Sequence, residues 1–438
     1  MGKGLDSIAK TRRYLRRNGL KRTVSAVMER ISAPKYEEFG FSPLDEKEIK
    51  NIKDYVFHNP VKISILVPAY RTNPAFFREL LDSVVAQYYP YWELVIADAS
   101  GNNDLEAIVE EYRAKLSEKS SIVYLMLAKN QGISENTNVA LEAATGDYIG
   151  LLDHDDVLTP DALFFMAKAI EKDSPVLLYS DEDKTDAELK TFYEPNRKKK
   201  LNLDLILTNN YICHFCVMKA EVMKELKFRK EFDGAQDFDI ILRCIATLKE
   251  DTEVIHIPRI LYHWRCHNES TAVNTDSKQY AYENGRYAVE DFMKQKGWDV
   301  QVKHMAHLGF YRTTYHPDIF SNRPDVGVVA GPVYKSGKIT GGAMKRDGTV
   351  MYKGLPKGYS GYMHRAALMQ QVGAGDVRNM KVRPELLNLW DTCVVPKLKE
   401  KNCDYAELSI AFCEQVRMLG YVVVYDPEQK NDRNLKER

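Results

Sequence analysis

The chain has no long hydrophobic run and few cysteines, and each absence narrows the class of protein. Among its 438 residues, no apolar stretch reaches the roughly 20 residues that a transmembrane helix needs. The basic N-terminus has no apolar core of the signal-peptide kind, so we expect a cytoplasmic protein. Seven cysteines, an odd number, are typical of reduced thiols rather than of a disulfide framework. Low-complexity tracts are also absent, and this length gives room for two or three folded domains.

The formal net charge is zero, but the basic residues are unevenly distributed. Residues 1–30 carry nine Lys or Arg against two acids. Apolar residues recur there at helical spacing, with Gly19 as a break between two helical pieces: Leu20, Val24, Val27, Met28 and Ile31. Residues 1–31 therefore predict either a helix lying on an anionic membrane surface or a helix packed against the next domain with its cations in water. No aromatic-interleaved basic patch occurs elsewhere, so nucleic acid is not an expected partner.

From residue 61 the sequence alternates between strand and helix patterns. Strand patterns at 62–68, 92–98, 122–127 and 147–152 alternate with helix patterns at 76–85, 104–117 and 133–144, and Thr159 is the expected N-cap of the next helix. This alternation predicts a mostly parallel sheet with helices on both faces. Ligands bind such sheets at the carboxyl ends of the strands. Pro68, Asp98 and the run 153–156 all fall at such ends, so we expect them to converge on one edge.

The run Asp153-His154-Asp155-Asp156 is the strongest local signal in the chain. It follows the apolar segment 147–152, so a strand is expected to place clustered carboxylates on a loop. Acids separated by one residue suit a hard divalent cation that also holds a diphosphate, because the cation neutralises the repulsion between the carboxylates. The alternative from these residues alone is a solvated acidic turn followed by a helix cap.

Two other segments contain reactive or charged residues but favour structural interpretations. Cys213-His214-Phe215-Cys216 has the CxxC spacing of two ligands of a zinc site, but no second CxxC or His pair supplies the other two. We therefore predict a core strand there. The basic run Lys198–Lys200 is predicted to be a mobile, exposed charge run.

In their order and spacing, residues 61–275 resemble glycosyltransferase family 2, the inverting nucleotide-sugar glycosyltransferases with the GT-A fold. The resemblance points to the bacterial rhamnosyltransferase-like branch that builds surface polysaccharides. It rests on the segments Ile65–Tyr70, Leu94–Ser100, Asn130–Ser134, Ala144–Tyr148, Leu152–Asp156, Tyr179–Asp183, Gln236–Asp239 and His256–Arg265.

The resemblance implies three regions along the chain. An α/β GT-A domain, a Rossmann-like and mostly parallel sheet with helices on both faces, is expected at 59–300. A basic amphipathic helical segment precedes it at 1–58. Residues 301–438 are similar to a degenerate half of the same domain, with Ser409 and Ala411 where the catalytic domain has Asp237 and Asp239. We therefore predict a smaller, non-catalytic α/β segment at the C-terminus.

On the donor side, the resemblance implies a divalent cation, Mg²⁺ or Mn²⁺, bound at Asp155. Asp153 is expected to contact the ribose or the metal, and His263 is the expected third metal ligand. Asp98 is similar to the acid that accepts a hydrogen bond from the pyrimidine ring. The other donor-binding residues that the resemblance implies are Pro68, Tyr70, Asn138 and Arg265.

On the acceptor side, the resemblance implies a general base. Asp237 is the candidate, with Asp239 as the fallback. Asp237 is expected at the start of a helix, where the helix dipole keeps a carboxylate ionised as a base requires.

The expected function is transfer of a sugar, rhamnose by this resemblance, from a dTDP- or UDP-linked donor to a hydroxyl of a lipid-linked glycan at the inner face of the cell membrane. One alternative is a non-catalytic polysaccharide-assembly scaffold with an inherited fold. The other is a sugar-nucleotide nucleotidyltransferase. That chemistry uses a glycine-rich loop after the first strand, and the loop Pro68–Asn73 contains no glycine.

Overall fold

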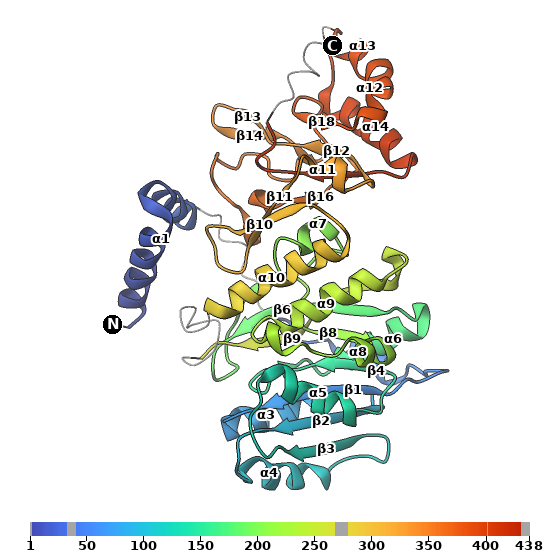
Figure 1. The fold of residues 1–438 in the computed structure, drawn as a ribbon. Helices are drawn as coiled ribbons and strands as arrows, with labels where there is room; N and C mark the ends of the chain where they lie inside the picture. The colour runs from blue at the N-terminus through green and yellow to red at the C-terminus, as the bar shows by residue number, and fades with distance from the viewer. Residues whose placement is uncertain (1, 33–40, 268–278, 401, 431–438) are drawn as a thin grey trace. The chain divides into compact units, whose positions relative to one another are not determined.

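The computed structural model describes residues 2–32, 41–267, 279–400 and 402–430 (Figure 1). The chain divides into two compact units. The first, here called the sheet unit, comprises Glu37–Leu201 and Asn210–Phe292. The second, the terminal unit, comprises Met1–Tyr36, Asn202–Asn209 and Met293–Arg438. The division at residues 58 and 300 expected from the sequence stays a prediction.

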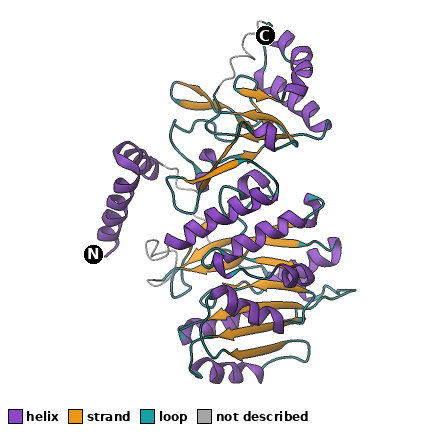
Figure 2. Ribbon diagram, in the orientation of Figure 1, coloured by secondary structure: helices purple, strands orange, loops and turns teal. Residues whose placement is uncertain are grey.

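The sheet unit is built on a nine-stranded sheet in the order β3-β2-β1-β4-β8-β6-β9-β5, with β7 paired to β6. Six of its strands run in one direction, and β5, β7 and β8 run the opposite way. The mostly parallel α/β fold expected from the sequence is therefore confirmed (Figure 2). The strands are β1 (Ile63–Ala69), β2 (Trp92–Asp98), β3 (Ser121–Met126), β4 (Tyr148–Leu151), β5 (Val157–Leu158), β6 (Leu177–Thr185), β7 (Phe192–Asn196), β8 (Cys216–Lys219) and β9 (Val254–Arg265).

Helices cover both faces of this sheet because its central strands are apolar on both sides. Alternate side chains of β1, such as Ile63 and Ile65, form one core with α3 (Pro74–Val85), α4 (Asp104–Arg113) and α6 (Ala162–Asp173). The other face is covered by α5 (Ile133–Ala143), which contacts β1 and β2 (Figure 1). The remaining helices are α2 (Glu46–Lys53), α8 (Ala220–Leu226), α9 (Gln236–Thr247) and α10 (Gln279–Gln295), whose last residues belong to the terminal unit.

The expected helices agree with the structure except at two boundaries. α4 ends at Arg113, four residues before the end of the pattern at 104–117. Thr159 was the expected N-cap of α6, but Asp161 occupies that position. The amide of Thr159 instead donates to the carbonyl of Leu261 at 3.1 Å, continuing the pairing of β5 with β9. The residue is therefore still part of an extended segment, and the helix begins two residues later than expected.

The terminal unit contains a four-stranded sheet, β16-β19-β12-β18, in which β12 and β19 are parallel. Its core gathers Val328, Trp390, Phe412 and Val423. Its parallel strands are β12 (Val326–Ala330) and β19 (Val422–Tyr425), and α14 (Tyr405–Met418) contacts both of them.

Smaller elements complete the terminal unit. They are α7 (Leu203–Ile206), β10 (Val300–His304), β11 (Tyr311–Tyr315), α11 (Ile319–Asn322), β13 (Val333–Lys335), β14 (Lys338–Gly341), β15 (Ala343–Met344), β16 (Gln370–Gln371), β17 (Ala374–Gly375), β18 (Met380–Val382), α12 (Leu387–Cys393) and α13 (Val395–Leu398).

The first helix, α1 (Gly2–Ser32), is bent at Gly19, whose φ of 77° is outside the helical range. Two helical pieces with a break at Gly19 were expected from the sequence, and this is confirmed. Within the described residues, none of the helices has both the length and the apolarity of a membrane span.

Candidate active site

Polar residues gather where the parallel strands of the sheet unit end. β1 ends at Ala69 beside the end of β2 at Asp98, and the loop 153–156 follows β4 at the same edge. The chain then turns back as β5, which pairs antiparallel with the end of β9 through Val157 and His263. Segments that are more than a hundred residues apart in the sequence therefore lie together around the acidic loop.

The acidic loop is fixed to β9 through Asp156. Its Oδ1 accepts a hydrogen bond from the amide of Arg265 at 2.7 Å, and its Oδ2 accepts one from the hydroxyl of Tyr262 at 2.5 Å. Burial, followed by the charges of Asp155 and Asp153, raises the pKa of Asp156 well above its ordinary value. The fully buried Asp156 is thus a structural anchor, and the loop is not a solvated turn.

Asp153 and Asp155 remain partly exposed on this anchored loop. The side chain of Asp153 is 49% exposed. Burial raises the pKa of Asp153, and Asp155 and Asp237 raise it further, whereas His214 lowers it. Asp237 is therefore close enough to Asp153 for the two charges to interact, although 84 residues separate them in the sequence.

A histidine contacts the carboxylate of Asp155, but it is not the one that the sequence indicated. Nε2 of His267 lies 2.7 Å from Oδ2 of Asp155. His263, the expected metal ligand, faces the other way: its Nδ1 lies 2.5 Å from Asp183, and its ring packs against Phe41 and Phe192. His267 follows the matched segment by two residues, which is why the sequence comparison missed it.

The residues of this loop fit a cation that is shared with a nucleotide. Within the described parts of the chain, no three His, Cys, Asp or Glu side chains converge as a preformed metal cage. Mg²⁺, however, is commonly held by one or two carboxylates together with substrate phosphates. Asp153 and Asp155 supply such carboxylates, which suit Mg²⁺ and Mn²⁺ alike, and the imidazole of His267 lies beside Asp155.

Asp98 lies buried at the end of β2 with two donors already on its carboxylate. Its Oδ1 accepts from the amide of Ser100 at 2.8 Å, and its Oδ2 accepts from the hydroxyl of Tyr124 at 2.6 Å. Burial, followed by Asp98, raises the pKa of Tyr124, so this hydroxyl stays a donor. A carboxylate oxygen accepts more than one hydrogen bond, so a further donor can still be accommodated.

The loop after β1 lies next to the loop after β2. The amide of Arg71 donates to the hydroxyl oxygen of Ser100 at 2.8 Å. Tyr70 is partly exposed, and the guanidinium of Arg71 lies over its ring. Pro68 is half-buried in β1. The two residues expected to line a base pocket therefore lie beside Asp98.

Asn138 and Arg265, both expected to bind the donor, make extensive contacts within the protein. Asn138 exchanges two hydrogen bonds of 2.8 Å with the backbone of Phe228, which attaches α5 to the segment before α9. The buried Arg265 donates through Nε to the carbonyl of Asp155 at 2.6 Å and through Nη1 to Glu79 at 2.5 Å. Its Nη2 is buried without a partner among the described residues.

The two candidate bases have different surroundings. Asp237 is the second residue of α9, and its Oδ2 accepts from the side-chain amide of Asn210 at 2.8 Å. Asp239 is buried between two arginines, Arg229 and Arg243, which occupy both of its carboxylate oxygens. Asp237 is thus the more accessible of the two.

The turn before β8 also belongs to this site. Sequence analysis predicted a core strand over 213–216, but β8 begins only at Cys216. Cys213 and His214 instead face the acids: Sγ of Cys213 lies 3.5 Å from Asp237, and Nε2 of His214 lies 3.7 Å from Asp153. Local sequence gave no signal for this, because the contacts come from partners 24 to 61 residues away.

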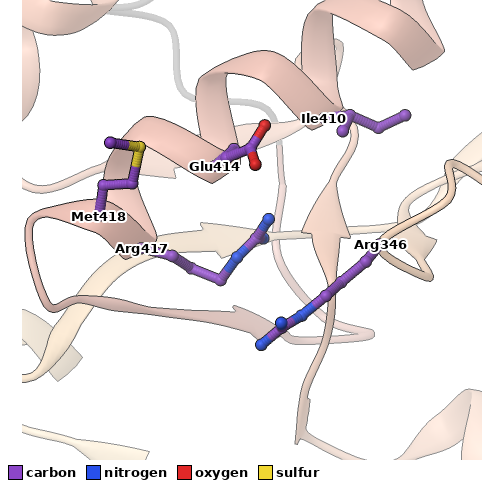
Figure 3. A pocket seen from close by; sticks show the side chains of 5 residues that line it. All are labelled: Arg346, Ile410, Glu414, Arg417 and Met418. Atoms are coloured by element: carbon purple, nitrogen blue, oxygen red, sulfur yellow. The ribbon is translucent and has the colours of Figure 1, made fainter.

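A separate cavity of about 310 Å³ lies in the terminal unit (Figure 3). Its lining includes Arg346, Glu414 and Arg417, and the two arginine side chains extend toward the same space. The guanidinium of Arg417 also donates to the carbonyl of Gly373. None of the residues expected to form the active site lines this cavity.

An α/β sheet that places clustered acids at its strand ends and a further acid at a helix start has the arrangement of a nucleotide-dependent transferase. Residues 64–227 match the sequence profile of the family described as Glycosyl transferase family 2. The chain therefore carries a glycosyltransferase family 2 domain, and the family expected from the sequence is confirmed.

Relatives with longer chains share this region. The chain is 38% identical over 234 residues to the uncharacterized protein y4gI of Sinorhizobium fredii, covering 53% of this chain and 25% of that protein. It is 32% identical over 281 residues to the O-antigen biosynthesis protein RfbC of Myxococcus xanthus, covering 60% of this chain and 21% of RfbC. The chain thus spans only about a quarter of the length of these curated relatives.

Among solved structures, the chain is similar to S. aureus TarS 1–349 in complex with UDP-GlcNAc. The sequence identity is 21%, the TM-score is 0.43, and the match covers 53% of this chain and 66% of that chain.

Proposed function

We propose that the chain is a metal-dependent, inverting glycosyltransferase that moves a sugar from a nucleoside-diphosphate donor to a hydroxyl of a growing cell-surface polysaccharide. One observation carries this proposal: Asp237 and Asp153 lie against the same turn, with Oδ2 of Asp237 3.5 Å from Sγ of Cys213 and Oδ2 of Asp153 3.7 Å from Nε2 of His214. A single-displacement transfer needs such a two-sided site, because the leaving group and the attacking hydroxyl lie on opposite sides of the sugar. The name of RfbC, an O-antigen biosynthesis protein, supports a polysaccharide as the product.

On the donor side, Asp153 and Asp155 would hold the cation, with His267 beside Asp155. A bound Mg²⁺ or Mn²⁺ would stabilise the charge that develops on the departing diphosphate. The protein's own part is to keep the two carboxylates in place. Asp156 does this through its hydrogen bonds to Tyr262 and Arg265.

On the acceptor side, Asp237 would act as the general base. The hydroxyl oxygen attacks the anomeric carbon, the bond from that carbon to the diphosphate oxygen breaks, and the hydroxyl proton passes to Asp237. Asn210 and Cys213 both contact Oδ2 of Asp237. No residue within the described part of the chain contacts its Oδ1, so that oxygen is left for the acceptor. Asp239 stays the fallback, although two arginines hold it.

The donor proposed from the sequence is a dTDP- or UDP-linked sugar, with rhamnose as the transferred group. Asp98 at the end of β2, which accepts a hydrogen bond from Tyr124 of β3, would form the polar floor on which a pyrimidine lies. Thermal-shift measurements against a panel of nucleotide sugars, with and without metal, would identify the donor, because a ligand that binds only the folded state raises its melting temperature.

The central test is Asp155→Asn in a donor-hydrolysis and transfer assay with Mg²⁺ or Mn²⁺. We expect this variant to lose transfer while keeping its fold. Full activity in Asp155→Asn would refute the metal assignment. If the unaltered chain releases no nucleoside diphosphate from any donor, the non-catalytic scaffold becomes the better proposal.

We also propose that α1 places the enzyme on an anionic membrane surface, where a lipid-linked acceptor would be found. The side of α1 that packs on the rest of the terminal unit makes polar contacts. Asn18 donates to the carbonyl of Ala306 at 3.2 Å, and the carboxylate of Glu29 accepts from the amides of Ser360 and Gly361. The opposite, outward row is apolar and exposed: Leu20, Val24, Val27, Met28 and Ile31.

An exposed apolar row flanked by Lys21, Arg22 and Arg30 has the chemistry of an interfacial helix. Leu20→Glu should weaken sedimentation with phosphatidylglycerol vesicles. Met418→Glu, which alters an equally exposed residue of α14, is the matched control and should not. Equal sedimentation of Leu20→Glu and the unaltered chain would refute the membrane proposal.

A further inference from the structure

His214 occupies a central place in the active site that no sequence pattern indicated. Its ring lies between two carboxylates. Nε2 is 3.7 Å from Oδ2 of Asp153, and Nδ1 is 3.3 Å from Oε2 of Glu182. The side chain is only 15% exposed, whereas Asp153 is 49% exposed. A fixed ring therefore faces a carboxylate that has freedom to rotate.

The ring is fixed by stacking and by its own backbone. It is stacked on Tyr262 with the ring centroids 4.6 Å apart and an angle of 11° between the planes. Tyr262 is itself held by Asp156, so His214 and the acidic loop share one support. The backbone amide of His214 donates to Oε2 of Glu182 at 3.2 Å.

A buried lysine holds the turn from the other side. Lys198 was expected in an exposed charge run, but its side chain is fully buried. Its ammonium lies 3.2 Å from Glu182 and donates to the carbonyls of Ile212 and His214. A buried ammonium is tolerated only when it is paired and hydrogen-bonded. Here all of these bonds go to the carbonyls of the turn 212–214 and to Glu182, and this fixes the position of His214.

We propose that His214 is a positioning residue for Asp153, and that it sets the orientation in which this carboxylate meets the nucleotide donor. Each ring nitrogen faces a carboxylate oxygen, Nε2 at 3.7 Å from Asp153 and Nδ1 at 3.3 Å from Glu182, at ion-pair distance rather than in a hydrogen bond. Within the described residues, the ring of His214 is the one imidazole, ammonium or guanidinium group within 4 Å of Asp153. The acids nearby, Asp155 and Asp237, repel it. Without the ring, the half-exposed Asp153 would turn toward water.

The same turn also connects the two sides of the site. Sγ of Cys213 lies 3.4 Å from Nε2 of His214 and 3.5 Å from Oδ2 of Asp237. The residue that orients the donor-side acid is thus the sequence neighbour of one that contacts the proposed base. This inference rests on the proposed function, because it takes Asp153 as a donor-binding residue.

The experiment measures the affinity of UDP and of dTDP, each with Mg²⁺, by calorimetry on the full chain. His214→Phe keeps the stacking on Tyr262 but removes both nitrogens. We expect it to weaken the affinity about 2- to 5-fold, the effect of losing an ion-pair contact to a half-exposed carboxylate. His214→Gln, whose amide nitrogen reaches the position of Nε2, should restore part of the affinity. His214→Asn reaches only the position of Nδ1 and should not.

Two further variants separate positioning from a structural role. His256→Phe removes another mostly buried histidine that is paired with an acid, Asp181, and stacked on a tyrosine. It should leave the affinity unchanged. In an Asp153→Asn background, His214→Phe should cause little further loss, because its effect acts through Asp153.

The outcomes are distinct. If the unaltered chain binds neither nucleotide, the proposed function fails. If the unaltered chain binds and His214→Phe binds equally well, only the positioning role is overturned. The same holds if His214→Phe weakens binding as much in the Asp153→Asn background as in the unaltered chain. Should His214→Phe not fold, the comparison of His214→Gln with His214→Asn decides, and equal affinities of those two would overturn the proposal.

Discussion

Helices α9 and α14 are the two that the sequence resemblance predicts to correspond, and their surroundings in the structure differ. In α9, Asp237 is the second residue, and its carboxylate faces Asn210 in the active site. In α14, the position that resembles Asp237 is Ser409, the fifth residue of the helix. Ser409 is fully buried. Its hydroxyl donates to the carbonyl of Tyr405 and accepts from the amide of Val377 at 3.1 Å.

The difference follows from where each helix begins. Asp404 caps α14 by accepting from the amides of Ala406 and Glu407, so the helix starts almost one turn earlier relative to the shared pattern. α9 begins at Gln236 without a side-chain cap. An acid at position 409 would point into the core of the terminal unit, where an unpaired charge is costly. The position that the resemblance matches thus holds a partly exposed carboxylate near the start of α9 and a buried packing contact in α14.

Asp237→Asn should produce the largest effect on activity. We expect kcat to fall by about 10²- to 10⁴-fold, the contribution typical of a general base, because the amide cannot accept the acceptor proton. Calorimetry with UDP or dTDP should show unchanged affinity, since Asp237 faces the acceptor side. Turnover close to that of the unaltered chain would place the base elsewhere and weaken the contrast between α9 and α14.

Asp239→Asn should mainly reduce stability. It leaves two mostly buried guanidinium groups, Arg229 and Arg243, without their shared carboxylate. Removing one partner of a buried ion pair costs about 3 to 5 kcal/mol in unfolding free energy. Equilibrium unfolding in denaturant measures this loss of unfolding free energy. Asp376→Asn in the terminal unit is the control and should cost less, because Asp376 pairs with Arg378 alone, which is 35% exposed. Equal losses would contradict this interpretation.

The two units should also respond differently to acid. Burial, followed by His364 and Arg17, lowers the pKa of His307 in the terminal unit from 6.5 to about 4. Between these values the unfolded chain binds more protons, so the stability of this unit should fall as the pH drops from 6.5 to 4. In the sheet unit, the pKa of Glu182 is lowered to about 2, although burial raises it, because Lys198 and His214 lower it more.

The stabilisation from Glu182 is fully present above its ordinary pKa of 4.5 and is lost only as the pH falls toward 2. Thermal unfolding measured between pH 7 and 4.5 should therefore show an early transition from the terminal unit, and its melting temperature should depend on pH. His307→Phe should reduce the pH dependence of that transition, and the remainder should come from His364, whose pKa is also lowered by burial. If the pH dependence persists unchanged in the variant, another group is responsible.

Ser409→Ala should give the smallest effect. It removes one hydroxyl from the core of the terminal unit and leaves the amide of Val377 without its acceptor. The expected loss is about 1 kcal/mol in unfolding free energy, with kcat unchanged. A large loss of turnover in this variant would show that α14 contributes to catalysis and would remove the contrast with α9.

The alternation of strand and helix patterns predicted most of the sheet unit, because apolar periodicity reports local burial. It also placed the acidic loop at a strand end. It did not identify His267, because 112 residues separate it from Asp155 and the contact depends on the register of β9 against β5. In that register His263 points to Asp183 instead.

Charged and polar runs were harder to predict for a related reason. Lys198 has the local sequence of an exposed charge run, and its burial depends on Glu182 and two backbone carbonyls supplied by other segments. His214 was assigned to a core strand because its neighbours are apolar. In both cases the position was decided by partners brought close through the sheet topology, which local sequence does not encode.

The hydrogen bonds from Tyr262 and Arg265 to Asp156 impose an order on the assembly of the site during synthesis. The acidic loop leaves the ribosome more than a hundred residues before the strand that fixes it. A nascent chain that ends at residue 227, where the family match ends, would contain the acids but not their anchor. Competence to bind a nucleotide should therefore arise only when β9 has left the ribosome, and released chains truncated at increasing lengths should acquire it abruptly near residue 267.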